Sequence, residues 1–231
     1  MVRHCLWSDS PDSEEQEVNG KKAKKMRAEN ARREKAIISG LTEWWDGEKA
    51  FYEYGACILT ARVVTDVLTH FKIPHRLVAV KSNAMNQKRY KRVTNLADYD
   101  DGLDFLDGEY SIGANDGQID ERGFGGHLIV ITSSDTLVDL TNYQFDRPLH
   151  NIVTGDGVRV TKVNGAFQGF INGKGFEIPL EKGVLFYWAM DTTAYRDSPD
   201  WRLSYKLSQE VIATITESLV YKGANAQQVD A

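Results

Sequence analysis

One of the two cysteines in the sequence, Cys57, occupies a position where a thiol gains reactivity. Apolar residues recur every three or four positions after it, a spacing that predicts a helix over 57–71. Gly55 permits a tight turn into this helix, so the cysteine falls in its first turn. A helix dipole favours negative charge at the N-terminus, and the thiolate is the nucleophilic form of cysteine. The position therefore predicts a nucleophile, with a small buried core residue as the alternative.

His127 stands between a glycine-rich segment and a run of apolar residues. The glycines of Gly123-Phe-Gly-Gly126 leave room for a substrate or another backbone to come close. The run His-Leu-Ile-Val-Ile-Thr at 127–132 predicts a strand that begins with the histidine. An imidazole beside a thiol acts first as general base and then as general acid, so we expect His127 to activate Cys57.

Asp139 is an acidic residue within an otherwise apolar segment, Leu137-Val-Asp-Leu-Thr141. Burial of a carboxylate costs free energy unless a partner compensates it. The turn at 133–135 predicts a hairpin in which Asp139 lies opposite His127 or one step diagonal to it, with Cβ atoms about 5–8 Å apart. Asp139 is then expected to hold the imidazole N–H and orient the ring, as in a catalytic triad. A turn or edge aspartate is the alternative.

The elements that must position these residues comprise helices first and then a mainly antiparallel sheet, which is typical of the α+β class. Helical periodicity extends over 37–45, 57–71 and 204–221. Strand patterns lie at 76–81, 127–132, 136–141, 158–163, 175–179 and 184–189. The polar stretch 83–126 predicts long loops with a short helix or strand, and loops of this length in a compact domain are often functional. Tyr143 and Gln144, just past the second strand of the hairpin, are expected at the surface, with a place in the cleft as the alternative.

Composition divides the chain into three parts. Residues 1–35 are predicted to be a flexible charged segment, with disorder over 8–17 and an exposed helix over 21–35. Residues 36–222 contain the apolar periodic segments and are predicted to form one catalytic domain. Residues 223–231 are predicted to be a short tail. The run Lys21-Lys22-Ala23-Lys24-Lys25 is expected to be a solvated charged face, with contact to an anionic partner as the alternative.

The overall composition narrows the possible functions. The 231 residues carry a net charge of −5, whereas dedicated nucleic-acid binders usually have a basic surplus. Two cysteines cannot build a disulfide framework, and no apolar run in the sequence is long enough to span a bilayer. The sequence contains no metal-ligand spacing, dinucleotide fingerprint or phosphate-binding loop. We therefore expect a cytoplasmic protein that uses no metal or cofactor and binds neither nucleic acid nor membrane.

Three segments, in chain order, resemble the transglutaminase-like superfamily. Gly55-Ala-Cys57 opens the predicted helix, and Phe71-Lys-Ile-Pro-His-Arg-Leu-Val-Ala79 resembles the family's turn from that helix into a strand. Gly126-His-Leu-Ile-Val130 resembles the family's histidine strand, and Leu137-Val-Asp-Leu-Thr141 resembles its Val-Asp-Pro-Thr element. Lys72 stands where glycine is usual, and Leu140 where proline is common. The resemblance covers about residues 50–145. It implies a papain-like core, with the cysteine on a helix N-terminus packed against an antiparallel β-sheet that carries the histidine and aspartate.

The resemblance also implies thiol chemistry through an acyl-enzyme intermediate. The family includes transglutaminases, peptidases, amidases and the related arylamine N-acetyltransferases. We expect a transglutaminase-like cysteine protease or amidase that acts on a protein or peptide amide, with hydrolysis and transfer both open. The oxyanion hole would combine the Cys57 N–H with a donor from Tyr52, Tyr54 or Trp45. The alternatives are a catalytically silent binding module that keeps the fold, and a small-molecule N-acyltransferase that uses a thioester donor.

Overall fold

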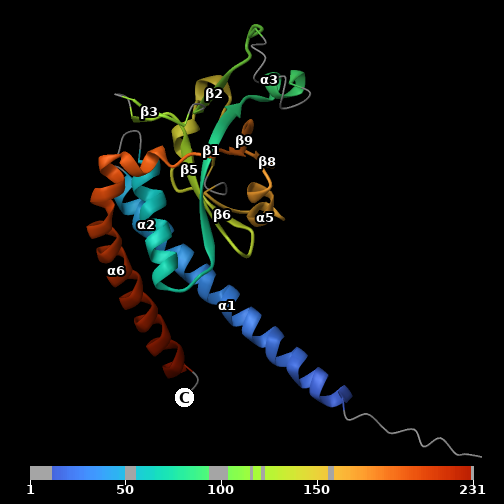
Figure 1. Ribbon diagram of the computed structural model, residues 1–231, viewed down its shortest axis with the longest axis vertical. Coiled ribbons are helices and arrows are strands. Elements are labelled where there is room, and N and C mark those ends of the chain that lie inside the picture. Colours follow the sequence, from blue (N-terminus) through green and yellow to red (C-terminus); the bar gives the residue numbers. More distant parts are fainter. Residues whose placement is uncertain are drawn as a thin grey trace, which may run out of the picture.

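The computed structural model describes residues 12–49, 56–93, 104–114, 117–120, 123–155 and 159–229. Its longer helices lie on one side of the sheet, with α2 between α6 and the strands, and α1 extends far beyond the body of the molecule (Figure 1). The α-helices among the described residues are α1 (Asp12–Glu48), α2 (Cys57–His70), α3 (Gln87–Arg92), α5 (Ala166–Ile171) and α6 (Pro199–Val229). No helix in the described part of the chain is long and apolar enough to cross a membrane.

Within the described residues, seven strands form one curled antiparallel sheet in the order β7-β6-β5-β1-β9-β8, with β2 paired to the far end of β1. These strands are β1 (His75–Met85), β2 (Ser111–Ala114), β5 (His127–Thr132), β6 (Thr136–Val138), β7 (Val160–Lys162), β8 (Gly175–Pro179) and β9 (Val184–Ala189). A separate pair, β3 (Ile119–Asp120) and β4 (Gly123–Phe124), forms a small antiparallel ladder. Helices packed on an antiparallel sheet confirm the predicted α+β class.

The apolar face of α2 holds the Cys57 helix against the sheet. Its buried side chains share one core cluster with residues of β5, α1 and α6; the cluster includes Val63, Val67, Leu68, Leu128, Val130, Ile37, Leu41, Val211 and Ile215. The helix ends because Lys72 adopts a left-handed conformation with φ 56°, and Pro74 follows where a helix cannot continue. The chain then turns directly into β1, which places α2 and the central strand side by side.

The other face of β5 contributes to a second core. Ile129 and Ile131 pack there with Leu137, Leu185 and Tyr187. Because side chains alternate along a strand, His127 lies on this same face of β5. Neighbouring side chains of β5 therefore pack into two different cores, one on each face of the sheet. This explains why the strand is apolar and buried throughout after its histidine.

The region 83–126 differs most from its prediction. β1 continues from the predicted end at 81 to Met85, because Ser82 and Asn83 are polar yet buried and pair with both β2 and β9. The rest of the region contains α3, β2, β3 and β4 in place of simple loops. Residues 94–103, 115–116 and 121–122 of this region lie outside the described residues.

The other predicted elements agree more closely with the structure. The predicted strands at 175–179 and 184–189 are confirmed with the same bounds, and the helix predicted over 57–71 ends one residue earlier, at His70. The second strand of the hairpin is shorter than predicted, because β6 ends at Val138 and the chain turns after Asp139. α6 begins at Pro199 rather than at 204, since proline suits the first turn of a helix.

The ends of the chain form longer helices than the sequence predicts. α1 begins at Asp12, so the disorder predicted over 8–17 is wrong for residues 12–17, and residues 8–11 lie outside the described part. Acidic residues favour a helix N-terminus, which accounts for the helical start. α1 passes residue 35 without a break, and α6 runs past 223 to Val229. Burial on α1 begins at Ile37, close to the predicted start of the domain, and the three-part division itself stays a prediction.

Candidate active site

Cys57 lies in the first turn of α2. Ala56, which precedes it, has no side-chain group to cap the helix, so the first backbone N–H groups keep their partial positive charge. The first turn contains no acidic residue to offset this charge. The Cys57 side chain is buried, with 4% of the residue exposed, among the apolar residues of the core cluster around α2. The helix therefore presents a sheltered thiol at its positive end.

His127, at the start of β5, makes a hydrogen bond with Asp139. Its Nε2 atom lies 2.8 Å from Asp139 Oδ2, and both side chains are almost completely buried. The hairpin register explains this contact: Val130 pairs with Val138 and Ile131 with Leu137, so Asp139 continues the series opposite Ile129. That position is diagonal to His127 on the same face of the sheet.

The Asp139 carboxylate accepts hydrogen bonds on both oxygens. Oδ2 accepts from His127 Nε2 and from the Tyr187 hydroxyl, and Oδ1 accepts from the Thr141 N–H and the Thr141 hydroxyl, each at 3.1 Å. Burial alone would raise the pKa of Asp139, but the charge of His127 and these hydrogen bonds lower it below its ordinary value. The carboxylate is therefore an ionised, fully hydrogen-bonded partner for the imidazole.

The surroundings of His127 favour its charged form. Burial opposes a positive charge on the ring, but the Asp139 carboxylate and, to a smaller extent, the Cys57 side chain raise its pKa to about 10. Since Nε2 faces Asp139, Nδ1 is the nitrogen left for the Cys57 sulfur. Aromatic rings fix the orientation of the imidazole: Tyr187 stacks on it at 6.0 Å between centroids, and Phe145 meets its edge at 5.2 Å.

Of the residues predicted to supply the second oxyanion donor, Tyr52 and Tyr54 lie outside the described residues. Trp45 is completely buried in the core beside α2, and its ring centroid is 6.5 Å from that of Tyr143. Tyr143 and Gln144 are both partly buried, so the structure decides neither for the surface nor for the cleft. Burial and the nearby charges of Asp139 and Cys57 raise the pKa of Tyr143, which places it beside the candidate site. The identity of the second donor therefore stays a prediction.

Tyr187 is the residue of this site that the sequence analysis missed. It lies on β9, where Leu185 and Tyr187 face the inner core while Phe186 and Trp188 face the other side. Its hydroxyl donates to Asp139 Oδ2, and burial together with the charge of Asp139 raises its pKa well above the ordinary value, so it remains a donor. The sequence does contain a signal for Tyr187, because its hydroxyl is the only one in the apolar, aromatic strand 184–189. A buried tyrosine usually makes a hydrogen bond through its hydroxyl, so a polar partner could have been expected.

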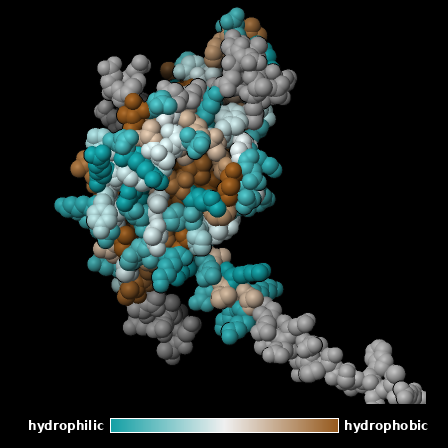
Figure 2. All heavy atoms as spheres, in the orientation of Figure 1, coloured by the Kyte–Doolittle hydropathy of each residue, from teal (hydrophilic) through white to brown (hydrophobic). Residues whose placement is uncertain are grey.

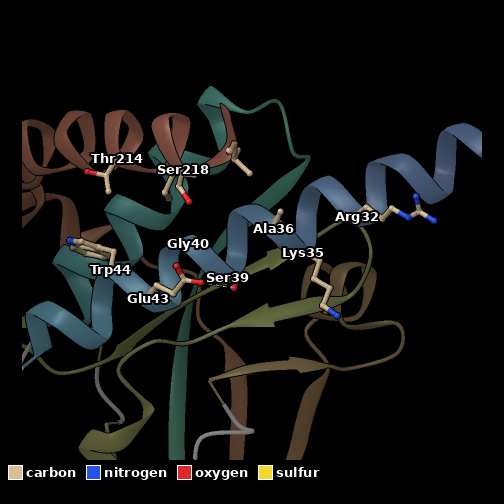
Figure 3. Close-up of a pocket in the computed structure, with 11 residues that line it drawn as sticks. Arg32, Lys35, Ala36, Ser39, Gly40, Glu43, Trp44, Thr214 and Ser218 are labelled. Atoms are coloured by element: carbon tan, nitrogen blue, oxygen red, sulfur yellow. Dashed lines mark hydrogen bonds between the residues drawn. The ribbon is translucent and has the colours of Figure 1, made fainter. Parts of the chain in front are cut away.

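A separate groove lies between α1 and α6 (Figure 3). Ala36, Gly40 and Trp44 of α1 and Ile215 and Leu219 of α6 form its apolar floor, and its cavity volume is about 520 Å³. Its lining includes none of the three residues of the candidate site. The space-filling view likewise shows apolar side chains gathered at several places on the visible face of the body (Figure 2).

Among the described residues, no group of three or more histidine, cysteine, aspartate or glutamate side chains is arranged to hold a metal ion. Comparison of the chain with protein-family models, with curated proteins and with solved structures finds no match to any of them.

Proposed function

We propose that this chain is a cysteine-dependent acyl-transfer enzyme in which Cys57 is the nucleophile, His127 the general base and acid, and Asp139 the residue that orients the imidazole. The observation that carries the proposal is the buried hydrogen bond between His127 Nε2 and Asp139 Oδ2, at 2.8 Å. It leaves Nδ1 for a thiol at the positive end of a helix. A thiol, an imidazole and an orienting carboxylate are the parts of a catalytic triad.

The raised pKa of His127 suits a pair that rests as thiolate and imidazolium. The thiolate would attack the carbonyl carbon of an amide and form a tetrahedral intermediate. Collapse would break the C–N bond while His127 Nδ1–H gives its proton to the leaving nitrogen, which leaves an acyl thioester on Cys57. Water or an amine would then attack the thioester, lose a proton to His127 and release the acyl group, so that the ion pair is restored.

The proposed substrate is a protein or peptide amide, and the proposed core is the papain-like arrangement of the transglutaminase-like superfamily. The α+β fold, with a cysteine on a helix that packs against a sheet carrying histidine and aspartate, supports this proposal. The backbone N–H of Cys57, in the uncapped first turn of α2, is the proposed first donor of the oxyanion hole. A reducing compartment such as the cytoplasm would keep the thiol available.

One observation favours a second candidate, a binding module that lacks catalytic activity. Cys57 and His127 are only 4% and 1% exposed, so a substrate carbonyl needs an opening toward the sulfur. In a silent module the same buried group would serve only to hold α2 on the sheet.

Trapping of the acyl-enzyme separates these possibilities. The chain is incubated with a panel of peptide amides, activated peptide esters and small acyl thioesters, and covalent adducts are located by mass spectrometry after rapid acid quench. We expect an acyl adduct on Cys57 that is absent in Cys57→Ala and strongly reduced in His127→Ala. Adducts from peptide donors support the peptidase or amidase, and adducts from thioesters alone support the N-acyltransferase. No adduct from any donor, with both variants folded, would favour the binding module.

A further inference from the structure

The central strand β1 has an unpaired edge over its first half. It pairs with β5 from His75 to Val80, but with β9 only from Val80 to Met85. β9 ends at Ala189, and the chain then leaves the line of the strand toward α6. On the β9 side, therefore, no strand among the described residues pairs with residues 75–79 of β1.

The backbone groups at this edge point outward. Ser133 N–H donates to Pro74 C=O at 2.8 Å, so residues 74, 76, 78 and 80 direct their hydrogen-bonding groups toward β5. Residues 75, 77 and 79 then direct theirs to the opposite edge, and Ala79 C=O does accept a bond there, from Met190 N–H at 2.8 Å. Leu77 is the next residue with this orientation. Its N–H and C=O have no backbone partner among the described residues.

This edge lines a pocket with a cavity volume of about 540 Å³. Thr65 of α2 forms one wall, Phe170 and Ile171 of α5 form another, and the segment from Ala189 to Thr193 closes one end. Ile171 is 45% exposed, so the pocket has an apolar contact available to a ligand. The space beside Leu77 is thus a slot between two helices, in line with β9.

We propose that this slot binds an extended acidic peptide, which adds to β1 as a short antiparallel strand in continuation of β9. An open strand edge offers backbone hydrogen bonds to any extended chain, and pockets beside it select the side chains. Leu77 N–H and C=O would make the pair of backbone bonds that β9 makes farther along β1.

Charge determines the kind of peptide. Arg76 and Arg196 are exposed at the pocket, each close to an aromatic ring, with guanidinium carbons 4.8 Å from the Phe167 ring and 5.9 Å from the Tyr195 ring. Neither arginine makes an ion pair with a carboxylate among the described residues. Asp191 also lines the pocket and offsets one of the two positive charges. An arginine matches a carboxylate with two parallel hydrogen bonds, so the remaining positive charge favours glutamate or aspartate in the peptide.

The docking site is independent of the cysteine chemistry. None of Cys57, His127 and Asp139 lines the pocket, and strand addition uses the backbone of β1 and two arginines. A Cys57→Ala variant should therefore bind the peptide as tightly as the natural chain, whether or not the chain is an enzyme.

Fluorescence anisotropy with two short labelled peptides tests the proposal. One alternates valine with glutamate and the other valine with lysine. We expect saturable binding of the acidic peptide, at least tenfold weaker binding of the basic one, and about a tenfold loss of affinity in Arg76→Glu or Arg196→Glu. Arg202→Glu, the same change at another exposed arginine, on α6 outside the pocket, is the matched control and should leave affinity unchanged.

Amide hydrogen exchange tests strand addition itself, because a purely electrostatic contact with the two arginines would not protect the Leu77 amide. Binding should slow exchange at Leu77, and an acidic peptide with N-methyl groups on alternate residues should neither bind nor protect. The proposal is overturned if the acidic peptide fails to bind at concentrations up to about 1 mM. It is also overturned if Arg76→Glu and Arg202→Glu weaken binding equally, or if exchange at Leu77 is unchanged in the saturated complex.

Discussion

The hydroxyl of Tyr187 offers a sharp test of the buried network, because Tyr187→Phe removes one oxygen atom and keeps the ring that stacks on His127. Asp139 Oδ2 would lose one of its two hydrogen bonds while remaining buried and ionised. A hydrogen bond to a charged group contributes about 1.5–3 kcal/mol to the free energy of unfolding. We therefore expect a loss of about 1.5–3 kcal/mol, which lowers the melting temperature by about 2–4 °C for each kcal/mol in a chain of this size.

Urea unfolding measured by tryptophan fluorescence gives this loss directly. Tyr195→Phe is the matched control, since Tyr195 is 5% exposed in the core beside α2 and its hydroxyl has no hydrogen bond to a described residue. That control should change the free energy of unfolding by less than about 0.5 kcal/mol. Equal destabilisation by the two changes would refute the reasoning, because the loss would then come from removal of any tyrosine hydroxyl and not from the bond to Asp139.

Asp139→Asn keeps the shape of the side chain but removes the charge that raises the pKa of His127, so the rate of Cys57 acylation should fall by about a hundredfold or more in stopped-flow assays; an unchanged rate would exclude an orienting role. Stability should be highest between about pH 4 and 6.5. It should fall as pH rises from about 6.5 toward 10, where His127 is neutral in the unfolded but still charged in the folded chain. It should also fall as pH drops below 3.8, where Asp139 is protonated in the unfolded but still ionised in the folded chain. Urea unfolding midpoints measured across pH test both predictions, and His127→Ala should remove most of the loss at alkaline pH. Glu34→Ala should cost about 1–2 kcal/mol in urea unfolding, since one Glu34 oxygen accepts from the hydroxyls of Thr132, Ser134 and Thr136, whereas Glu29→Ala on the exposed part of α1 should cost almost nothing.

Local patterns predicted the parts of the fold that depend on neighbours in sequence. The period of three to four apolar residues indicated α2, and the apolar run after His127 indicated β5. The His127–Asp139 contact was also foreseeable, because a hairpin brings together residues only twelve positions apart. The catalytic roles of the two residues, and of Cys57, stay predictions.

Contacts between residues far apart in the sequence account for the features of the site and the sheet that local patterns did not indicate. Tyr187 is 48 residues from Asp139 and meets it only because β1 pairs with β5 on one side and with β9 on the other. The sequence did not indicate the second half of β1 because this half, too, depends on pairing with distant strands. Ser82 and Asn83 have the composition of a loop, and two neighbouring strands bury them. The start of α1 was missed because a charged, polar composition is shared by disordered segments and exposed helices.

The most direct test of the central claim is the pH dependence of iodoacetamide alkylation at Cys57, followed by peptide-level mass spectrometry in the natural chain and in His127→Ala. The proposed thiolate–imidazolium pair predicts rapid labelling below pH 7 that is lost in the variant. Labelling that begins only above about pH 8 and is the same in both proteins would be that of an ordinary thiol, and would contradict the proposed nucleophile.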